Sequence, residues 1–223
     1  MLIGIEGCIG AGKTTLTQFS SQFLTCRPVY EEPERNPFLE DFYHASEKKQ
    51  LARHLLYTFL LLQERQLRSI LPFSTSGELV ICDFHPLKNL VFAKVLLSVR
   101  DQTLLTEIYH TLSIPQPDLL IYLKSDEHTM LSRLRKKGDP YANANSIDFT
   151  FITQMASAYE TFFRSSYKGR FMTIDTSGLD YYQRSDDIHV PLQNIQEALD
   201  ILPYIKPGLT GSAERKMSRR EER

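Results

Sequence analysis

Residues 7–14 read Gly-Cys-Ile-Gly-Ala-Gly-Lys-Thr, which matches the pattern G-x-x-x-x-G-K-[ST]. Residues 1–5 form an apolar run before this pattern, and residues 14–24 follow it with apolar side chains at helical spacing. The pattern therefore lies between a predicted strand and the N-terminus of a predicted helix, where backbone N–H groups stabilise anions. In such a loop the N–H groups surround phosphate, the lysine reaches the β- and γ-phosphates, and the Ser or Thr hydroxyl holds Mg²⁺. The sequence predicts a nucleoside triphosphate site made of Gly7, Cys8, Ile9, Gly10, Ala11, Gly12, Lys13, Thr14 and Thr15.

Four more apolar runs alternate with helical segments along the chain, at residues 28–31, 78–83, 118–123 and 170–175. With the first run they make five strands, and the alternation predicts an α/β fold in which helices flank both faces of a parallel sheet. Ligands of such sheets bind outside the carboxyl ends of the strands. Glu32 and Asp83 follow or end two of these runs, so we expect both carboxylates at the edge that holds the phosphate loop.

The composition is that of an ordinary globular protein, with 42% apolar and 24% charged residues among 223. We expect a single domain over residues 1–205 and a disordered tail over residues 206–223, where the chain is polar and lacks apolar periodicity. The net charge of −1 gives no reason to expect a nucleic-acid partner.

The three cysteines lack the spacing of metal ligands, and the N-terminus lacks the basic flank of a signal peptide. The longest apolar stretch, around residues 55–62, is too short to cross a bilayer. We therefore expect a cytoplasmic protein without a membrane partner.

Two carboxylates are candidates for chemistry at the sheet edge. Glu32 could accept a proton from a substrate hydroxyl that attacks the γ-phosphate, or it could hold Mg²⁺. Asp83 could serve the metal or the attacking group. The alternatives are an acidic turn in solvent for Glu32 and a helix cap at Pro86 for Asp83.

Basic residues gather just before Gly138, at Arg133, Arg135, Lys136 and Lys137. Arg133 and Lys137 are four residues apart and share a helix face. A mobile basic segment that closes over the γ-phosphate would stabilise the charge of phosphoryl transfer, and residues 138–145 have the composition of a hinge or lid. The alternative is a charged helix face in solvent.

These ordered patterns resemble the deoxynucleoside kinase family, especially its bacterial deoxyadenosine and deoxyguanosine kinases. The resemblance rests on residues 5–15, on Glu31-Glu32-Pro33 followed by residues 36–43, on residues 133–138 and on residues 174–181. It implies a three-layer P-loop kinase fold with a small lid, ATP as the phosphate donor, Mg²⁺ and a homodimer. It also implies Glu32 as the base for the nucleoside 5′-hydroxyl, Tyr43 near the deoxyribose 3′-hydroxyl and Asp180 near the adenine of ATP.

The sequence departs from the family pattern at three places. Phe84 follows Asp83 where the family usually has an arginine, and Lys88, about one helical turn further on, could supply the lost charge. After Gly138, Asp139 and Ala142 stand where the family lid has Arg and a sugar-binding Glu. The long helix over residues 46–71 offers Gln63 or Thr58 to the base.

The sequence predicts a kinase that uses Mg-ATP to phosphorylate a nucleoside or deoxynucleoside at its 5′-hydroxyl, with purine deoxynucleosides favoured by the resemblance. The alternatives are a nucleoside monophosphate kinase of the thymidylate type and a nucleotide-binding protein with impaired catalysis. The residues predicted to take part in the transfer are Glu32, Lys13, Asp83 and Arg133. The residues predicted to bind the donor outside the phosphate loop are Arg133, Lys137 and Asp180. The residues predicted to contact the nucleoside are Glu32, Tyr43, Gln63, Asp83 and Lys88, and those predicted to hold Mg²⁺ are Thr14 and Glu32.

Overall fold

A five-stranded parallel sheet forms the middle of the protein, as seen in a computed structural model that describes residues 1–45, 48–137, 149–180 and 184–201. The strand order is β2-β3-β1-β4-β5, and every neighbouring pair runs parallel. The strands are β1 (Leu2–Gly7), β2 (Arg27–Val29), β3 (Val80–Cys82), β4 (Leu119–Lys124) and β5 (Phe171–Asp175). The predicted five-stranded parallel sheet is therefore confirmed.

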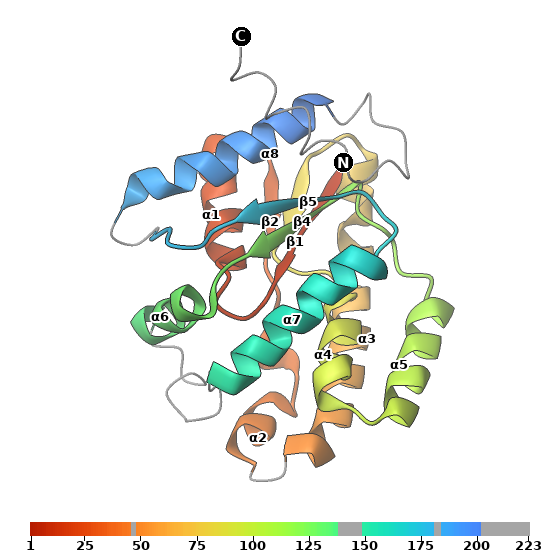
Figure 1. The fold of residues 1–223 in the computed structure, drawn as a ribbon. Helices are drawn as coiled ribbons and strands as arrows, with labels where there is room; N and C mark the ends of the chain where they lie inside the picture. Colours follow the sequence, from red (N-terminus) through yellow and green to blue (C-terminus); the bar gives the residue numbers. More distant parts are fainter. Residues whose placement is uncertain (46–47, 138–148, 181–183, 202–223) are drawn as a thin grey trace.

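Helices cover both faces of the sheet and complete three layers (Figure 1). The helices on one face are α1 (Lys13–Phe23) and α8 (His189–Ile201), while those on the other are α3 (Lys48–Thr75), α4 (Lys88–Leu96), α5 (Val99–Thr111) and α7 (Phe149–Ser165). Successive side chains of β1 point to opposite faces, so Leu2 packs in the larger core under α3, α4 and α7, and Ile3 packs in the smaller core under α1 and α8.

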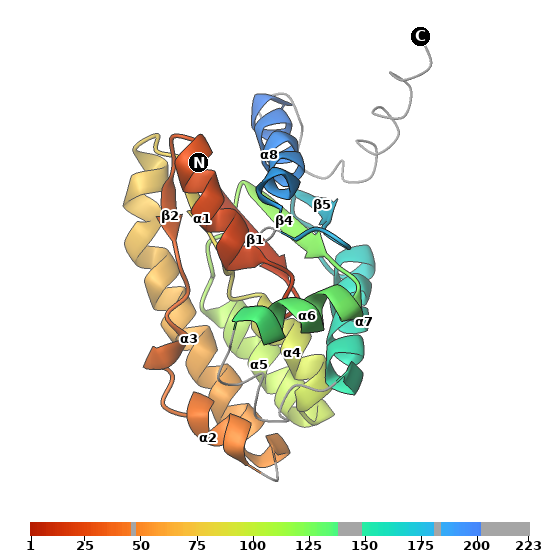
Figure 2. The ribbon, with the colours of Figure 1, turned by 90° about the vertical axis from the view of Figure 1, so that its left-hand side faces the viewer.

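The remaining short elements lie near the carboxyl ends of the strands. They are α2 (Leu39–His44), α6 (Glu127–Lys137) and the 3₁₀ turns Pro33–Arg35 and Ser185–Ile188. Helix α6 crosses the carboxyl end of β1 (Figure 2). Segments 138–145 and 206–223, which the sequence marks as a lid and a tail, lie outside the described residues.

Helix α3 is longer than the sequence predicts, because it continues through Pro72 to Thr75 instead of stopping at Leu71. A proline removes one backbone donor from a helix and normally ends it. Here the side chains close the last turn, since the hydroxyls of Ser74 and Thr75 both donate to the carbonyl of Leu71. Among the described residues, no helix combines the length and the apolar composition that a membrane crossing needs.

Candidate active site

The phosphate loop joins the end of β1 to the start of α1. Gly10 and Gly12 have φ angles of 82° and 99°, a left-handed region that favours glycine. A Cβ on Gly10 would lie 2.6 Å from the carbonyl oxygen of Met130, so α6 packs directly on the loop. The ammonium of Lys13 donates to the carbonyls of Gly7 (2.8 Å) and Cys8 (3.1 Å), which places this cation inside the loop.

Asp83 directly follows β3, and its carboxylate accepts hydrogen bonds from residues that come after β1 and β2. Its Oδ2 accepts a hydrogen bond from the Thr14 hydroxyl (2.7 Å), and its Oδ1 accepts one from the backbone N–H of Glu31 (2.7 Å). Burial raises the pKa of Asp83, while the Thr14 hydroxyl and the Glu31 amide oppose this rise. The carboxylate therefore lies where the sequence predicts it, beside the hydroxyl that follows Lys13.

The pair Thr14 and Asp83 fits Mg²⁺, which prefers oxygen ligands and is usually held by one or two protein groups together with substrate phosphates and water. The described residues contain no cluster of three His, Cys, Asp or Glu side chains that could hold a metal alone. An ion at this place would therefore depend on the bound phosphates for most of its ligands.

The structure brings Glu31 into the main cavity and leaves Glu32 out of it. Glu31 lines the cavity together with Lys13 and Thr14. Glu32 instead pairs with Arg35 (2.8 Å) and faces a separate hollow between α3 and the segment after β2. Glu32, predicted as base and metal ligand, is therefore not among the residues that line the main cavity, whereas Glu31 is. The physical reason is that neighbouring residues of an extended segment point to opposite sides.

Lys88 supplies a cation to Glu31 from the first turn of α4. Its ammonium donates to both carboxylate oxygens of Glu31 at 2.5 Å, and both side chains are largely buried. Burial alone would lower the pKa of Lys88, but Glu31 and then Glu6 raise it above its ordinary value. Phe84, where the family has an arginine, is fully buried in the larger core.

Gln63 lies behind Glu31, outside the set of residues that line the main cavity. Its side-chain amide donates to Glu31 Oε1, and its own oxygen accepts a hydrogen bond from the Asn89 amide (2.7 Å). Asn89 lines the cavity and is almost fully buried. The sequence analysis missed Asn89, although an amide within the apolar run Leu87–Ala93 was a signal that could have found it.

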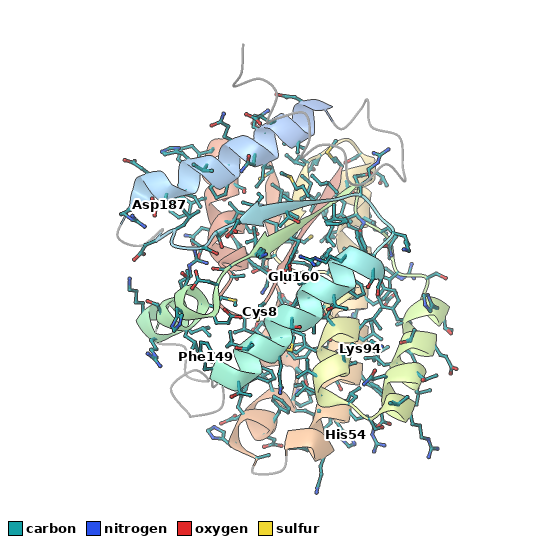
Figure 3. All side chains as sticks on the ribbon, viewed as in Figure 1. Cys8, His54, Lys94, Phe149, Glu160 and Asp187 are labelled. Atoms are coloured by element: carbon teal, nitrogen blue, oxygen red, sulfur yellow. The ribbon has the colours of Figure 1, made fainter. Side chains whose placement is uncertain are left out.

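The main cavity has a volume of about 290 Å³ and runs from the phosphate loop to α2, α3, α4 and α7. Figure 3 labels Cys8 in the phosphate loop and Phe149 at the start of α7, and both of these elements contribute residues to the lining. Most of its lining is apolar, and the aromatic side chains are Phe42, Tyr43, Phe59, Phe92, Phe151 and Tyr159. Tyr43 therefore lines the cavity, and its predicted contact with the deoxyribose stays a prediction. The polar end at the loop and the aromatic walls suit a phosphate and a planar ring.

Both terminal nitrogens of the Arg133 guanidinium donate hydrogen bonds to groups of the protein. Its Nη1 donates to the carbonyl of Ala11 (2.9 Å) and to the Thr176 hydroxyl (3.2 Å), and its Nη2 donates to the carbonyls of Thr176 (2.8 Å) and Leu179 (2.9 Å). The side chain is buried. Arg133 thus joins α6 to the phosphate loop and to the segment after β5. Arg133 also lines the main cavity beside Lys13 and Thr14, and its predicted action on the transferred phosphate stays a prediction.

The Arg133→Met variant is expected to be less stable by about 3 kcal/mol, since it leaves several buried carbonyls without donors. For a chain of this size we expect the thermal midpoint to fall by about 8 °C. Arg135→Met, which removes an exposed arginine of the same helix, is the matched control and should leave the midpoint unchanged. Equal midpoints for Arg133→Met and Arg135→Met would contradict this role.

Of the other residues predicted to bind the donor, the structure describes the side chain of Asp180 but not that of Lys137. Asp180 pairs with Lys136 (2.5 Å), so the segment after β5 is tied to α6 a second time. Lys137 ends α6, but its side chain lies outside the part of the chain that the structure describes, and so do Asp139 and Ala142.

Comparison with known proteins identifies the family. The family model for deoxynucleoside kinases matches residues 3–199. The chain belongs to the deoxynucleoside kinase family. It is 31% identical over 204 residues to a deoxyguanosine kinase of Bacillus subtilis (strain 168), in an alignment that covers 88% of this chain and 97% of that protein. As a member of the family, the protein is a kinase that transfers phosphate from ATP to a deoxynucleoside.

Two other matches complete the comparison. A probable thymidylate kinase of Archaeoglobus fulgidus is 32% identical over 145 residues, covering 62% of this chain and 71% of that protein. A solved structure of deoxyadenosine kinase from M. mycoides, with dCMP and dCDP bound, matches with a TM-score of 0.73 and 23% identity. That match covers 88% of this chain and 100% of the other. The structural match shows that this kinase has the same fold as the family member.

Proposed function

We propose that this deoxynucleoside kinase phosphorylates purine deoxynucleosides at the 5′-hydroxyl, with Mg-ATP as the donor and Glu31 as the general base. One observation carries the proposal: the Glu31–Lys88 ion pair lies in the same cavity as Lys13 and Thr14. A carboxylate at this place can reach a hydroxyl that points toward the phosphate loop, which is the geometry that general-base catalysis requires.

The residues of this cavity have separate roles in the proposed phosphoryl transfer. Lys13 and the loop amides hold the donor phosphates, and the glycines keep those amides turned inward. Thr14 and Asp83 would hold Mg²⁺, which supplies positive charge to the donor phosphates when bound. Glu31 accepts the proton of the attacking hydroxyl, while Lys88 keeps both oxygens of that carboxylate in place. The apolar walls exclude water, which strengthens these electrostatic interactions.

Two observations support a purine substrate. The Bacillus subtilis relative is named for deoxyguanosine. In addition, Asn89 places a buried amide oxygen that has no hydrogen-bond partner among the described residues, and this residue lines the cavity. A buried polar atom of this kind costs free energy unless a ligand satisfies it, and the amino or imino hydrogens of a purine would do so.

The test is an ATP-consumption assay against all natural deoxynucleosides, nucleosides and their monophosphates, with Lys13→Ala as the blank. We expect a signal with deoxyguanosine or deoxyadenosine that Lys13→Ala abolishes. A signal with pyrimidine deoxynucleosides alone would contradict the purine preference. Turnover of monophosphates alone would instead favour a thymidylate-type kinase, and ATP binding without any turnover would favour a protein with impaired catalysis.

We also propose a cytoplasmic homodimer, as the family resemblance implies. Helix α4 packs against α3, α5 and α7 within one chain. Exposed apolar side chains remain on α3 and α5, at Leu61, Val99 and Leu104. Light scattering on the purified protein would decide between one copy and two.

A further inference from the structure

Asn36 is a buried polar residue that none of the steps above uses. It begins the run 36–43, which carries part of the family resemblance and ends at Tyr43. Only 3% of its surface is exposed, although an amide side chain gives up its hydrogen bonds to water when it is buried. The partners of this amide within the protein therefore indicate its role.

Both the backbone and the side chain of Asn36 are hydrogen-bonded. Its Nδ2 donates to the carbonyl of Leu55 in α3 (3.0 Å), and its Oδ1 accepts a bond from the backbone N–H of Phe38 (3.1 Å). Its backbone N–H donates to the carbonyl of Pro33 (3.0 Å), and its own carbonyl accepts a bond from the N–H of Leu39 (3.1 Å). Asn36 therefore joins the 3₁₀ turn after β2 and the start of α2 to α3.

The bond between Asn36 and Leu55 connects two walls of the main cavity. Figures 1 and 2 both show α2 beside the first half of α3, and the two helices are in contact. The rings of Phe38 and His54, with centroids 5.3 Å apart, form a second contact at the same junction. The residues that α2 and α3 contribute to the cavity lining are Leu39, Phe42, Tyr43, Leu55, Leu56 and Phe59.

Helix α2 depends on contacts of this kind for its position. It has six residues, and a helix this short is not stable without tertiary packing. Asparagine suits the junction because its amide both donates and accepts hydrogen bonds, and because it readily bonds the backbone two residues further on. Alanine at position 36 would remove the bond to α3 and the side-chain acceptor of the Phe38 N–H together.

We propose that Asn36 is a positioning residue for the deoxynucleoside: its amide holds α2 against α3, so that Phe42 and Tyr43 are in place before the substrate enters. The proposal rests on the proposed function, because it takes the main cavity as the site of the deoxynucleoside. A wall that is already ordered lowers the cost of binding. Helix α2 carries none of the groups assigned to the transfer, so the loss of Asn36 should weaken deoxynucleoside binding and leave the transfer nearly unchanged.

The experiment compares Asn36→Ala with the wild type and with Asn194→Ala, which makes the same change at a partly exposed site on α8. Steady-state turnover is measured with the best deoxynucleoside and with ATP as the varied substrates. For Asn36→Ala we expect the KM for the deoxynucleoside to rise about tenfold, while kcat and the KM for ATP stay within about threefold of the wild type. Asn194→Ala should match the wild type in each value.

A second variant keeps the test decisive if Asn36→Ala folds poorly. Its thermal midpoint is expected about 3 °C below that of the wild type. His54→Ala removes the ring contact with Phe38 from an exposed position on α3 (Figure 3), and it should raise the KM for the deoxynucleoside about threefold. A wild-type KM for the deoxynucleoside in both variants would overturn the proposal, and so would a fall in kcat at an unchanged KM.

Amide hydrogen exchange tests the attachment of α2 without any substrate. The amides of residues 39–44 should exchange about tenfold faster in Asn36→Ala than in the wild type, whereas those of α8 should not change. Unchanged exchange in α2 would overturn the proposal. A failure of the proposed function would look different, because the wild type would then bind ATP and turn over no deoxynucleoside. The exchange of α2 would still support or overturn its attachment by Asn36.

Discussion

Glu31→Gln is expected to lower kcat about a thousandfold, because the amide cannot accept the proton of the attacking hydroxyl. Glu32→Gln, at the next residue, should change kcat by no more than about threefold, since it loses only a partly exposed ion pair with Arg35. The two variants make the same chemical change at adjacent positions. They therefore distinguish the carboxylate in the cavity from the one outside it.

The measurement for this prediction is steady-state turnover of the best deoxynucleoside with ATP, together with calorimetric binding of ATP. Glu31→Gln should bind ATP nearly as the wild type does, because the donor phosphates are held by Lys13 and the loop amides. Thermal unfolding checks that both variants fold. If Glu32→Gln were the inactive variant, Glu32 would be the base after all, and the segment after β2 would have to turn over when substrate binds.

The fold was predictable from the sequence because its main signals are local. Buried parallel strands appear as short apolar runs, and the phosphate loop marks where the first strand ends and the first helix begins. The error at the end of α3 arose because the pattern of residues along the chain does not reveal hydrogen bonds made by side chains. The sequence analysis ended this helix at residue 71, but α3 continues through Pro72 to Thr75, where side-chain hydroxyls complete its last turn.

The site was harder to predict because its chemistry depends on side-chain direction. In the pair Glu31-Glu32, both residues are glutamates at the end of one strand, and only the backbone conformation decides which one faces the cavity. Arg133 has the charge expected of a phosphate ligand. Its donors nevertheless point to carbonyls of segments more than 40 residues away in either direction. Such contacts are properties of the packed structure, and residue spacing does not reveal them.

Lys88→Met is expected to lower kcat about a hundredfold, because Lys88 is the cation that holds both oxygens of the proposed base. Lys88→Arg keeps the charge and should restore most of the activity. Lys94→Met is the matched control, because it removes an exposed lysine of the same helix (Figure 3) and should leave kcat unchanged. Retention of wild-type kcat in Lys88→Met would contradict the view that this lysine takes over from the missing family arginine.

A double variant tests how Lys88 acts. If Lys88 works by orienting Glu31, its loss should matter little once Glu31 has already become glutamine. We therefore expect kcat of Lys88→Met/Glu31→Gln to lie within about threefold of Glu31→Gln alone, since residues that act as a unit have strongly non-additive effects. Fully additive losses would show instead that Lys88 acts directly on the transferred phosphoryl group. The distinction matters for the family pattern, because Phe84 leaves this chain without the usual arginine and Lys88 reaches the same carboxylate from the first turn of α4.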